Sequence, residues 1–234
     1  MGCCSEKMNA VKNKFNQLSL SEEETAITMK EKSLPFSSVR LQDLSNAIHK
    51  NSSNGMLSIA QLRKAMTELN FEVEIFTSPE DHISCLLKLL QNSKRLYDVK
   101  TVIMFGVLLS AGIPEEKAGI LFDLCDINDN HYIQEEDFKG ILSELIDISV
   151  EKIPCIAINN NDSELEGFTI PEDHLLQYTA CLLKNKASMI SRITSVLFAE
   201  QKIMRKGEFV NRISNDSFLE TILWSFQIRL ALID

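Results

Sequence analysis

The stretch Asp126–Asp137, with the sequence DINDNHYIQEED, constrains the fold of this chain more than any other feature. Aspartate and asparagine alternate with other residues in its first half, and an aspartate closes it. Apolar residues at helical spacing flank it on both sides, at Ile120, Leu121 and Leu124 before it and at Phe138, Ile141, Leu142 and Leu145 after it. This spacing predicts two amphipathic helices joined by a loop rich in oxygen ligands.

The loop has the length and the ligand pattern of a calcium-type helix–loop–helix site, the EF-hand. Such a loop holds a hard cation through oxygen atoms at positions 1, 3, 5, 7, 9 and 12, with position 7 acting through its backbone carbonyl and position 9 often through a water. Ile133, at position 8, is expected to pair with a partner loop in a short strand. The predicted ligands are Asp126, Asn128, Asn130, Tyr132, Gln134 and Asp137.

Two residues of this loop depart from the usual pattern. Position 6 normally holds glycine because φ is positive there, and His131 occupies it here at a modest strain. Position 12 is Asp137 instead of glutamate, and its shorter side chain makes bidentate coordination harder. We therefore expect one weak calcium site that also accepts magnesium. The alternative is a turn of the same shape that holds no metal and whose oxygens bond within the loop.

The pattern of helix, short loop and helix recurs four times, but the other three loops lack suitable ligands. If Gly55 is placed at position 6 of the first loop, then Lys50 stands at position 1, where a carboxylate is needed, and Gln61 stands at position 12. The second and fourth loops carry basic residues, namely Lys94 and Arg95 in the second and Lys202, Arg205 and Lys206 in the fourth. These three are interpreted as structural loops that bind no metal.

The predicted fold class is all-α, a two-lobed EF-hand protein with four helix–loop–helix units, three of them degenerate. A hydrophobic content of 44% with only 8 glycines and 5 prolines suits a packed helical chain. The predicted divisions are a polar, basic N-terminal segment (1–35), a first lobe (36–112), a second lobe with the intact loop (113–216) and an apolar C-terminal helix (217–234).

Three further segments have local signals. Ser21 and Glu24 suggest a capping box for a short helix that Pro35 ends. Residues 150–170 have no helical stripe and contain three consecutive asparagines, which indicates a linker. The C-terminal segment FLETILWSFQIRLALI is apolar nearly all round. We expect this last segment to lie in the apolar groove of the protein until it is displaced, or to help wall that groove.

The amino terminus, MGCCSEK, suggests acylation. Gly2 is the residue that myristoylation requires, and Cys3 and Cys4 stand where palmitate would be added. One myristoyl chain binds membranes only marginally, so a second acyl chain makes the attachment stable. Lys7, Lys12 and Lys14 would add attraction to an anionic leaflet. Glu6 occupies the place where serine or threonine is usual, and an unmodified terminus is the alternative.

Composition excludes several other classes. The net charge of −9 makes a nucleic-acid partner unlikely and suits cations or basic target helices. No apolar run approaches the roughly 20 residues that span a bilayer, and no secretory signal is present. Scattered cysteines indicate a reducing compartment. No nucleophile–base pair or phosphate-binding glycine loop points to an enzyme.

On these motifs the chain resembles the neuronal calcium sensor family (recoverin-, frequenin- and guanylyl-cyclase-activator-like proteins) and, more distantly, calcineurin B. The resemblance covers roughly residues 36–225 and rests on MGCC at the start, on GIPEEKAGILFDLCDINDNHYIQEEDFKGIL, and on EFVNRISNDSFLETIL near the end. It implies two lobes of paired hands, myristate on Gly2, an ion held by the loop, and a groove that takes a target helix. The chain departs from the family at hands two and four, which usually bind calcium there.

Two functions are therefore expected as alternatives. The first is a calcium sensor or modulator anchored at the cytoplasmic face of a membrane, with a possible cytosolic pool, that binds a helix of a target protein. The second is a constitutive adaptor or scaffold subunit that binds its partner without calcium, because a switch needs differential affinity between two states and three loops lack ligands.

Overall fold

The computed structural model describes residues 20–71, 82–158, 170–199 and 201–233, and most of them are helical. Strands occur in the described residues as short antiparallel pairs, β1 with β2 and β3 with β4. The all-α class predicted from the sequence is thereby confirmed. Gly2, Cys3 and Cys4 lie outside the described residues.

The first half of the chain contains α2 (Glu22–Ser33), the 3-10 helix η1 (Pro35–Ser38), α3 (Leu41–Asn51), β1 (Met56–Leu57), α4 (Ile59–Glu68), α5 (His82–Leu89), β2 (Tyr97–Asp98) and α6 (Val99–Leu109). The second half contains α7 (Pro114–Cys125), β3 (Tyr132–Gln134), α8 (Glu135–Asp147), the π-helix η3 (Ile148–Lys152), the 3-10 helix η4 (Ile153–Ala157), α9 (Glu172–Leu183), α10 (Lys186–Phe198), β4 (Ile203–Arg205), α11 (Lys206–Asn215), α12 (Ser217–Glu220), η6 (Thr221–Leu223) and α13 (Ser225–Ile233).

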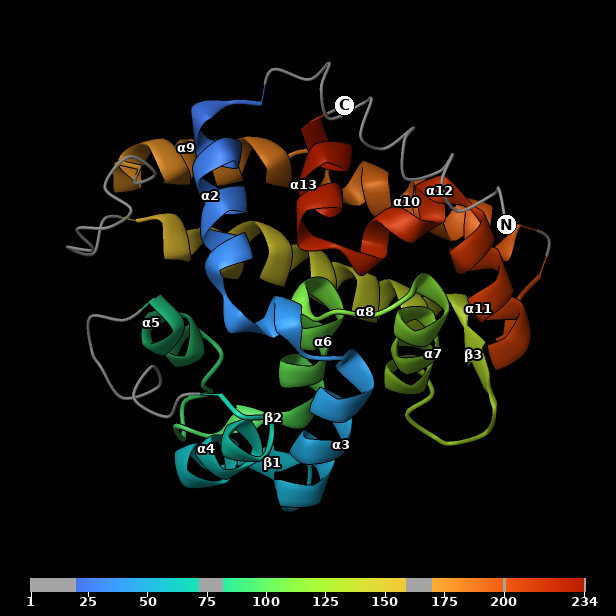
Figure 1. The fold of residues 1–234 in the computed structure, drawn as a ribbon. Helices are drawn as coiled ribbons and strands as arrows, with labels where there is room; N and C mark the ends of the chain where they lie inside the picture. Colours follow the sequence, from blue (N-terminus) through green and yellow to red (C-terminus); the bar gives the residue numbers. More distant parts are fainter. Residues whose placement is uncertain (1–19, 72–81, 159–169, 200, 234) are drawn as a thin grey trace, which may run out of the picture.

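Each short strand lies in a loop between two helices, and the strands join these loops in pairs (Figure 1). In the first pair, Met56 lies opposite Asp98 and Leu57 opposite Tyr97. In the second pair, Ile133 of β3 lies opposite Met204 of β4. The pairing expected for Ile133 is therefore present. Because each strand stands at the end of its loop, next to the helix that follows, each antiparallel pair holds two helix–loop–helix segments side by side.

Helix starts follow the local signals in the sequence. Pro114 opens α7, where its missing N–H leaves no bond unmade. Ser58 and Gln61 form a capping box at α4, with bonds of 2.8 and 3.3 Å between backbone and side chain. Ser21 caps α2 by accepting from the Glu24 N–H at 3.2 Å. The Glu24 carboxylate does not complete the expected box, because it is buried and bonded to other helices.

One hydrophobic core extends from the region of the β1–β2 pair to that of the β3–β4 pair. Buried residues of α3 to α8 and of α10 to α13 belong to the same hydrophobic cluster. Aromatic rings pack beside the second strand pair: Phe138 contacts Phe198 and Phe209, with ring centroids 6.0 and 5.7 Å apart. Phe122 contacts Phe209 at 5.6 Å. These rings fix α7, α8, α10 and α11 around the loop that begins at Asp126. The predicted domain boundaries stay a prediction.

Two sequence expectations differ from the structure. Residues 150–157, expected to belong to a linker, continue α8 as η3 and η4, because Val150, Ile153 and Ile156 recur every third residue and are buried. The C-terminal helix is also interrupted. Trp224 adopts an extended backbone (φ −140°, ψ 124°) between η6 and α13. Among the described residues, every helix is too short or too polar to cross a membrane.

Candidate metal centre

The predicted metal loop begins where α7 ends, with Asp126 as the C-cap residue of that helix. The Asp126 carboxylate accepts two backbone N–H bonds, from Asn130 to Oδ1 at 3.0 Å and from His131 to Oδ2 at 2.9 Å. The loop thus folds back over its first residue. Each carboxylate oxygen has two lone pairs, so these bonds leave Asp126 able to bind a cation as well.

The other predicted side-chain ligands contribute unequally to the shape of the loop. Asn130 Oδ1 accepts from the Tyr132 N–H at 3.2 Å, and Asp137 Oδ2 accepts from the Gln134 N–H at 3.0 Å. The Asn128 side chain has no hydrogen-bond partner among the described residues. Asp126 is half-buried, and the other predicted ligands are exposed. These internal bonds are also the ones expected of a loop that holds no metal, so the geometry agrees with both hypotheses.

His131 has a φ of 65°, as position 6 of such a loop requires, and Asp129 has a φ of 49°. Both are in the left-handed region, which L-residues adopt at a cost and which glycine adopts freely. Candidate ligand atoms of Asp126, Asp129 and His131 lie within 4.8 Å of one another. Asp129 and His131 are not among the ligands predicted from the sequence, because positions 4 and 6 supply none in the twelve-residue scheme.

The far side of the loop is anchored by the strand pair. Ile133 and Met204 are both buried, while their neighbours in β3 and β4 are exposed. Lys206, the residue after β4, donates to both oxygens of Asp123 in α7 at 2.7 and 2.6 Å. The loop is therefore held by the apolar packing of Ile133 and Met204, and by the ion pair between Lys206 and Asp123. Cys125 beside it stays a thiol, because burial raises the pKa of its side chain.

The other loops use their polar side chains for local structure. Lys50 pairs with Glu68 at 3.0 Å, and Gln61, the residue at position 12 of that loop, closes the capping box with Ser58. Asn92 Oδ1 accepts from the N–H groups of Lys94 and Leu96, and Asp98 caps α6 through the Thr101 N–H. These oxygens already serve as turn acceptors and helix caps. The prediction that these loops bind no metal stays a prediction.

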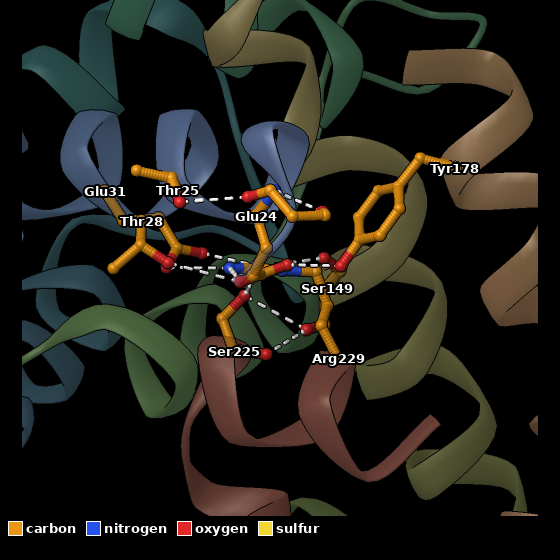
Figure 2. A network of polar contacts seen from close by, with 9 residues as sticks. Glu24, Thr25, Thr28, Glu31, Ser149, Tyr178, Ser225 and Arg229 are labelled. Atoms are coloured by element: carbon orange, nitrogen blue, oxygen red, sulfur yellow. Dashed lines mark hydrogen bonds and ion pairs between the residues drawn. The ribbon is translucent and has the colours of Figure 1, made fainter. Parts of the chain in front are cut away.

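A second polar centre, not predicted from the sequence, lies away from the loop. Arg229 of α13 is fully buried and forms ion pairs with Glu24 and Glu31 of α2 at 2.9 and 2.8 Å. Figure 2 shows these groups converging with Ser149, Ser225 and Tyr178. The carboxylates of Glu31 and Glu24 outweigh the effect of burial and raise the pKa of Arg229 above its usual range. One signal was available in the sequence: Arg229 is the lone charge within the apolar run ILWSFQIRLALI.

Comparison with known proteins adds no relative. The chain matches no protein family model, and it matches no curated protein. The assignment of function therefore depends on the geometry of the loop and on the packing around it.

Proposed function

We propose that the chain is an EF-hand protein that holds one divalent cation in the loop Asp126–Asp137, calcium weakly or magnesium, and that binds a helix of a target protein. Its four helix–loop–helix units form two lobes, in which the three degenerate loops are structural. The N-terminal segment anchors it at the cytoplasmic face of a membrane through Gly2, Cys3 and Cys4, with a cytosolic pool when acylation is incomplete. It is a modulator and has no catalytic role.

One observation carries the proposal. The Asp126 carboxylate lies under the turn at Asn130 and His131, and Ile133 pairs with Met204 of the neighbouring loop. Asp126 at position 1 and Ile133 at position 8 therefore already make the contacts that shape an ion-binding loop before an ion binds. Carboxylate, amide and carbonyl oxygens are also the ligands that calcium and magnesium prefer. A single loop with two acidic predicted ligands supports weak binding.

A second candidate function is a constitutive adaptor, and the buried C-terminal segment favours it. Ile228, Arg229 and Leu232 are fully or almost fully buried. Arg229 links α13 to α2, and Asn185 donates to the Leu232 carbonyl at 2.9 Å. A helix held at several points resists displacement. In this alternative the partner binds elsewhere, and ion binding makes no difference to it.

Calorimetric titration of the full chain with calcium, and separately with magnesium, tests the ion site. We expect one site for the native chain and loss of its heat in Asp126→Ala. The matched control is Asp129→Ala, which removes a carboxylate from the same loop at a position outside the predicted ligands. Equal loss in both variants would assign binding to the Asp126–Asp129–His131 cluster instead. No heat at millimolar ion would leave the adaptor hypothesis.

The membrane anchor is tested by flotation with vesicles after expression in cells that acylate proteins. We expect the native chain to float. Gly2→Ala should release it to the soluble fraction, and Cys3→Ser with Cys4→Ser should give intermediate, reversible binding. Lys7→Gln serves as a control, because it removes one charge and leaves both acylation sites. Equal flotation of the native chain and Gly2→Ala would contradict the anchor.

A further inference from the structure

The guanidinium group of Arg229 is bound on every side. Its Nε donates to the two oxygens of Glu24 at 3.1 and 2.9 Å, and its Nη2 donates to Glu24 Oε1 at 2.9 Å. Nη1 and Nη2 form the two parallel bonds with Glu31, at 2.8 and 3.0 Å. Nη1 also donates to the Ser149 carbonyl at 3.1 Å and to Ser225 Oγ at 2.6 Å. All three guanidinium nitrogens thus take part in hydrogen bonds.

This pattern selects arginine over lysine. A guanidinium is planar and presents five donors in a fixed fork, which matches two carboxylates lying on adjacent sides. An ammonium group has three donors on one atom and could not reach both Glu24 and Glu31 in this arrangement. The two acidic residues lie seven positions apart on α2, which places them on the same face of the helix.

Without Arg229, the carboxylates on α2 would be left without a charge partner among their described neighbours. The Glu24 side chain has no exposed surface, and that of Glu31 is 8% exposed. Tyr178 donates to Glu24 Oε2 at 2.6 Å and Thr28 donates to Oε1 at 3.2 Å, but both donors are neutral. Burial and the charge of Glu24 raise the pKa of Tyr178, which keeps its hydroxyl protonated. A buried carboxylate that loses its cation is strongly destabilising.

We propose that Glu24 and Glu31 form a guanidinium-binding site, and that a partner helix which takes the place of α13 carries an arginine at the position of Arg229. This inference rests on the proposed function, in which the chain binds a target helix. The partner is thereby defined by chemistry: an apolar helix with one arginine that becomes buried. A helix with apolar residues alone is rejected, because it leaves two carboxylates unpaired.

The contacts around α13 specify the neighbours of that arginine. Ile228, one residue before it, and Leu232, three residues after it, are buried, so apolar residues are required there. Ser225, four residues before it, is also buried, and its carbonyl and hydroxyl both contact Ser149 Oγ, at 2.8 and 3.0 Å. A small residue is required at that place. The partner sequence is small–x–x–apolar–Arg–x–x–apolar.

The test uses the full chain carrying Arg229→Met, which weakens the docking of its own α13. It is titrated with fluorescently labelled synthetic peptides of residues 217–234, one native and one also carrying Arg229→Met. We expect the native peptide to bind at least tenfold more tightly. Adding Glu24→Gln and Glu31→Gln to the chain should remove most of this preference. A peptide with Gln227→Met, a half-buried position outside the network, is the matched control and should bind like the native peptide.

Equal affinity for the two peptides, binding of neither, or a preference that survives Glu24→Gln with Glu31→Gln would each overturn the proposal. If circular dichroism shows that Arg229→Met does not fold, hydrogen exchange in the milder variant Glu31→Gln decides. Amides of α13 should then exchange at least tenfold faster while those of α11 keep their rates, and an unchanged α13 would overturn it. Neither experiment needs a divalent ion or a natural target, so its failure is distinguishable from failure of the ion site.

Discussion

The ammonium nitrogen of Lys117 lies 3.3 Å from the centroid of the Trp224 ring. The same nitrogen donates to the carbonyls of Val107 at 2.7 Å and Leu223 at 3.3 Å. Lys117 belongs to α7, Val107 to the last turn of α6, and Leu223 to the end of η6. One buried cation therefore satisfies carbonyls at two helix ends and packs on the tryptophan that separates η6 from α13. These contacts join the C-terminal segment to the middle of the chain.

The Lys117 contact predicts a pH-dependent stability. Burial lowers the pKa of Lys117 to about 7, whereas an unfolded lysine titrates near 10.4. Between these pH values the unfolded chain binds more protons than the folded chain, so the free energy of unfolding of the protein rises with pH. We expect the free energy of unfolding of the native chain, minus that of Lys117→Met, to rise by on the order of 2 kcal/mol from pH 7 to 9.5. Urea unfolding at both pH values measures it.

The comparison with Lys117→Met also removes the effect of Cys125. Burial raises the pKa of that thiol, so its contribution is fully present below the unfolded value near 8.5 and is lost as the pH rises further. This effect has the opposite sign but is the same in both chains, and it cancels in the difference. A difference that stays flat or falls with pH would contradict the assignment to Lys117.

Replacing His131 should relieve strain in the loop. Its φ of 65° is a position that glycine adopts without the clash that a Cβ atom brings. We expect His131→Gly to raise the free energy of unfolding by about 0.5–1 kcal/mol. His131→Ala, which removes the imidazole but keeps the Cβ atom, is the control and should bring no gain. Equal effects of the two variants would show that the ring, and not the backbone, decides stability here.

Lengthening Asp137 should change the ion preference. A glutamate at position 12 reaches the ion with both oxygens, which favours calcium over the smaller, octahedral magnesium. We expect Asp137→Glu to raise calcium affinity by at least about tenfold and to leave magnesium binding little changed. Glu136→Asp changes the length of the neighbouring exposed side chain in the opposite sense and should do neither. Calorimetry with each ion checks this, and a parallel gain for both ions would contradict it.

The contact between Ile133 and Met204 should couple the two loops energetically. Both residues are buried and lie opposite each other in the strand pair. Each alanine substitution is expected to cost about 2–4 kcal/mol, since it leaves a cavity under the loop. The double variant should cost less than the sum by at least about 0.5 kcal/mol, because the residues share one contact. Strict additivity in denaturant unfolding would count against this coupling.

Burial should distinguish the ion pairs of Arg229 from that of Arg40, although their nitrogen–oxygen distances are similar. Arg229→Met leaves Glu24 and Glu31 buried without their cation, and we expect it to cost about 3–5 kcal/mol. Arg40 pairs with Glu116 at 2.7 Å, but its side chain is 68% exposed. Arg40→Met should cost less than about 1 kcal/mol. Thermal and urea unfolding compare the two variants, and similar losses would refute the role given to burial.

The helical segments and the candidate loop were predictable because their signals are local. Ser58 marks a helix start through capping bonds within one turn, and Pro114 marks one because its missing N–H leaves no bond unmade. The alternation from Asp126 to Asp137 predicted the turn and the positive φ at His131 within twelve residues of chain. Residues 150–157 were misassigned, because this stretch departs from α-helical geometry: it continues α8 first as the π-helix η3 and then as the 3-10 helix η4.

The Arg229 network could not be predicted in the same way. Glu24 and Arg229 are 205 residues apart in sequence, and Glu24 had a plausible local role beside Ser21. The local bond of a capping box is weak next to a paired, buried guanidinium, so tertiary packing decided where the carboxylate lies. The burial of Lys117 could not be predicted from the sequence either, because it depends on the packing of α6 and η6 around this residue of α7.

By itself, the sequence determined the helical class, the helix starts at Ser21, Ser58 and Pro114, and the composition of the loop from Asp126 to Asp137, since each depends on residues within a turn or two. Tertiary structure alone decided the partner of Ile133, the break at Trp224 and the ion pairs of Arg229. The physical reason is that burial sets the strength of a charge interaction, and burial depends on which distant segments pack together.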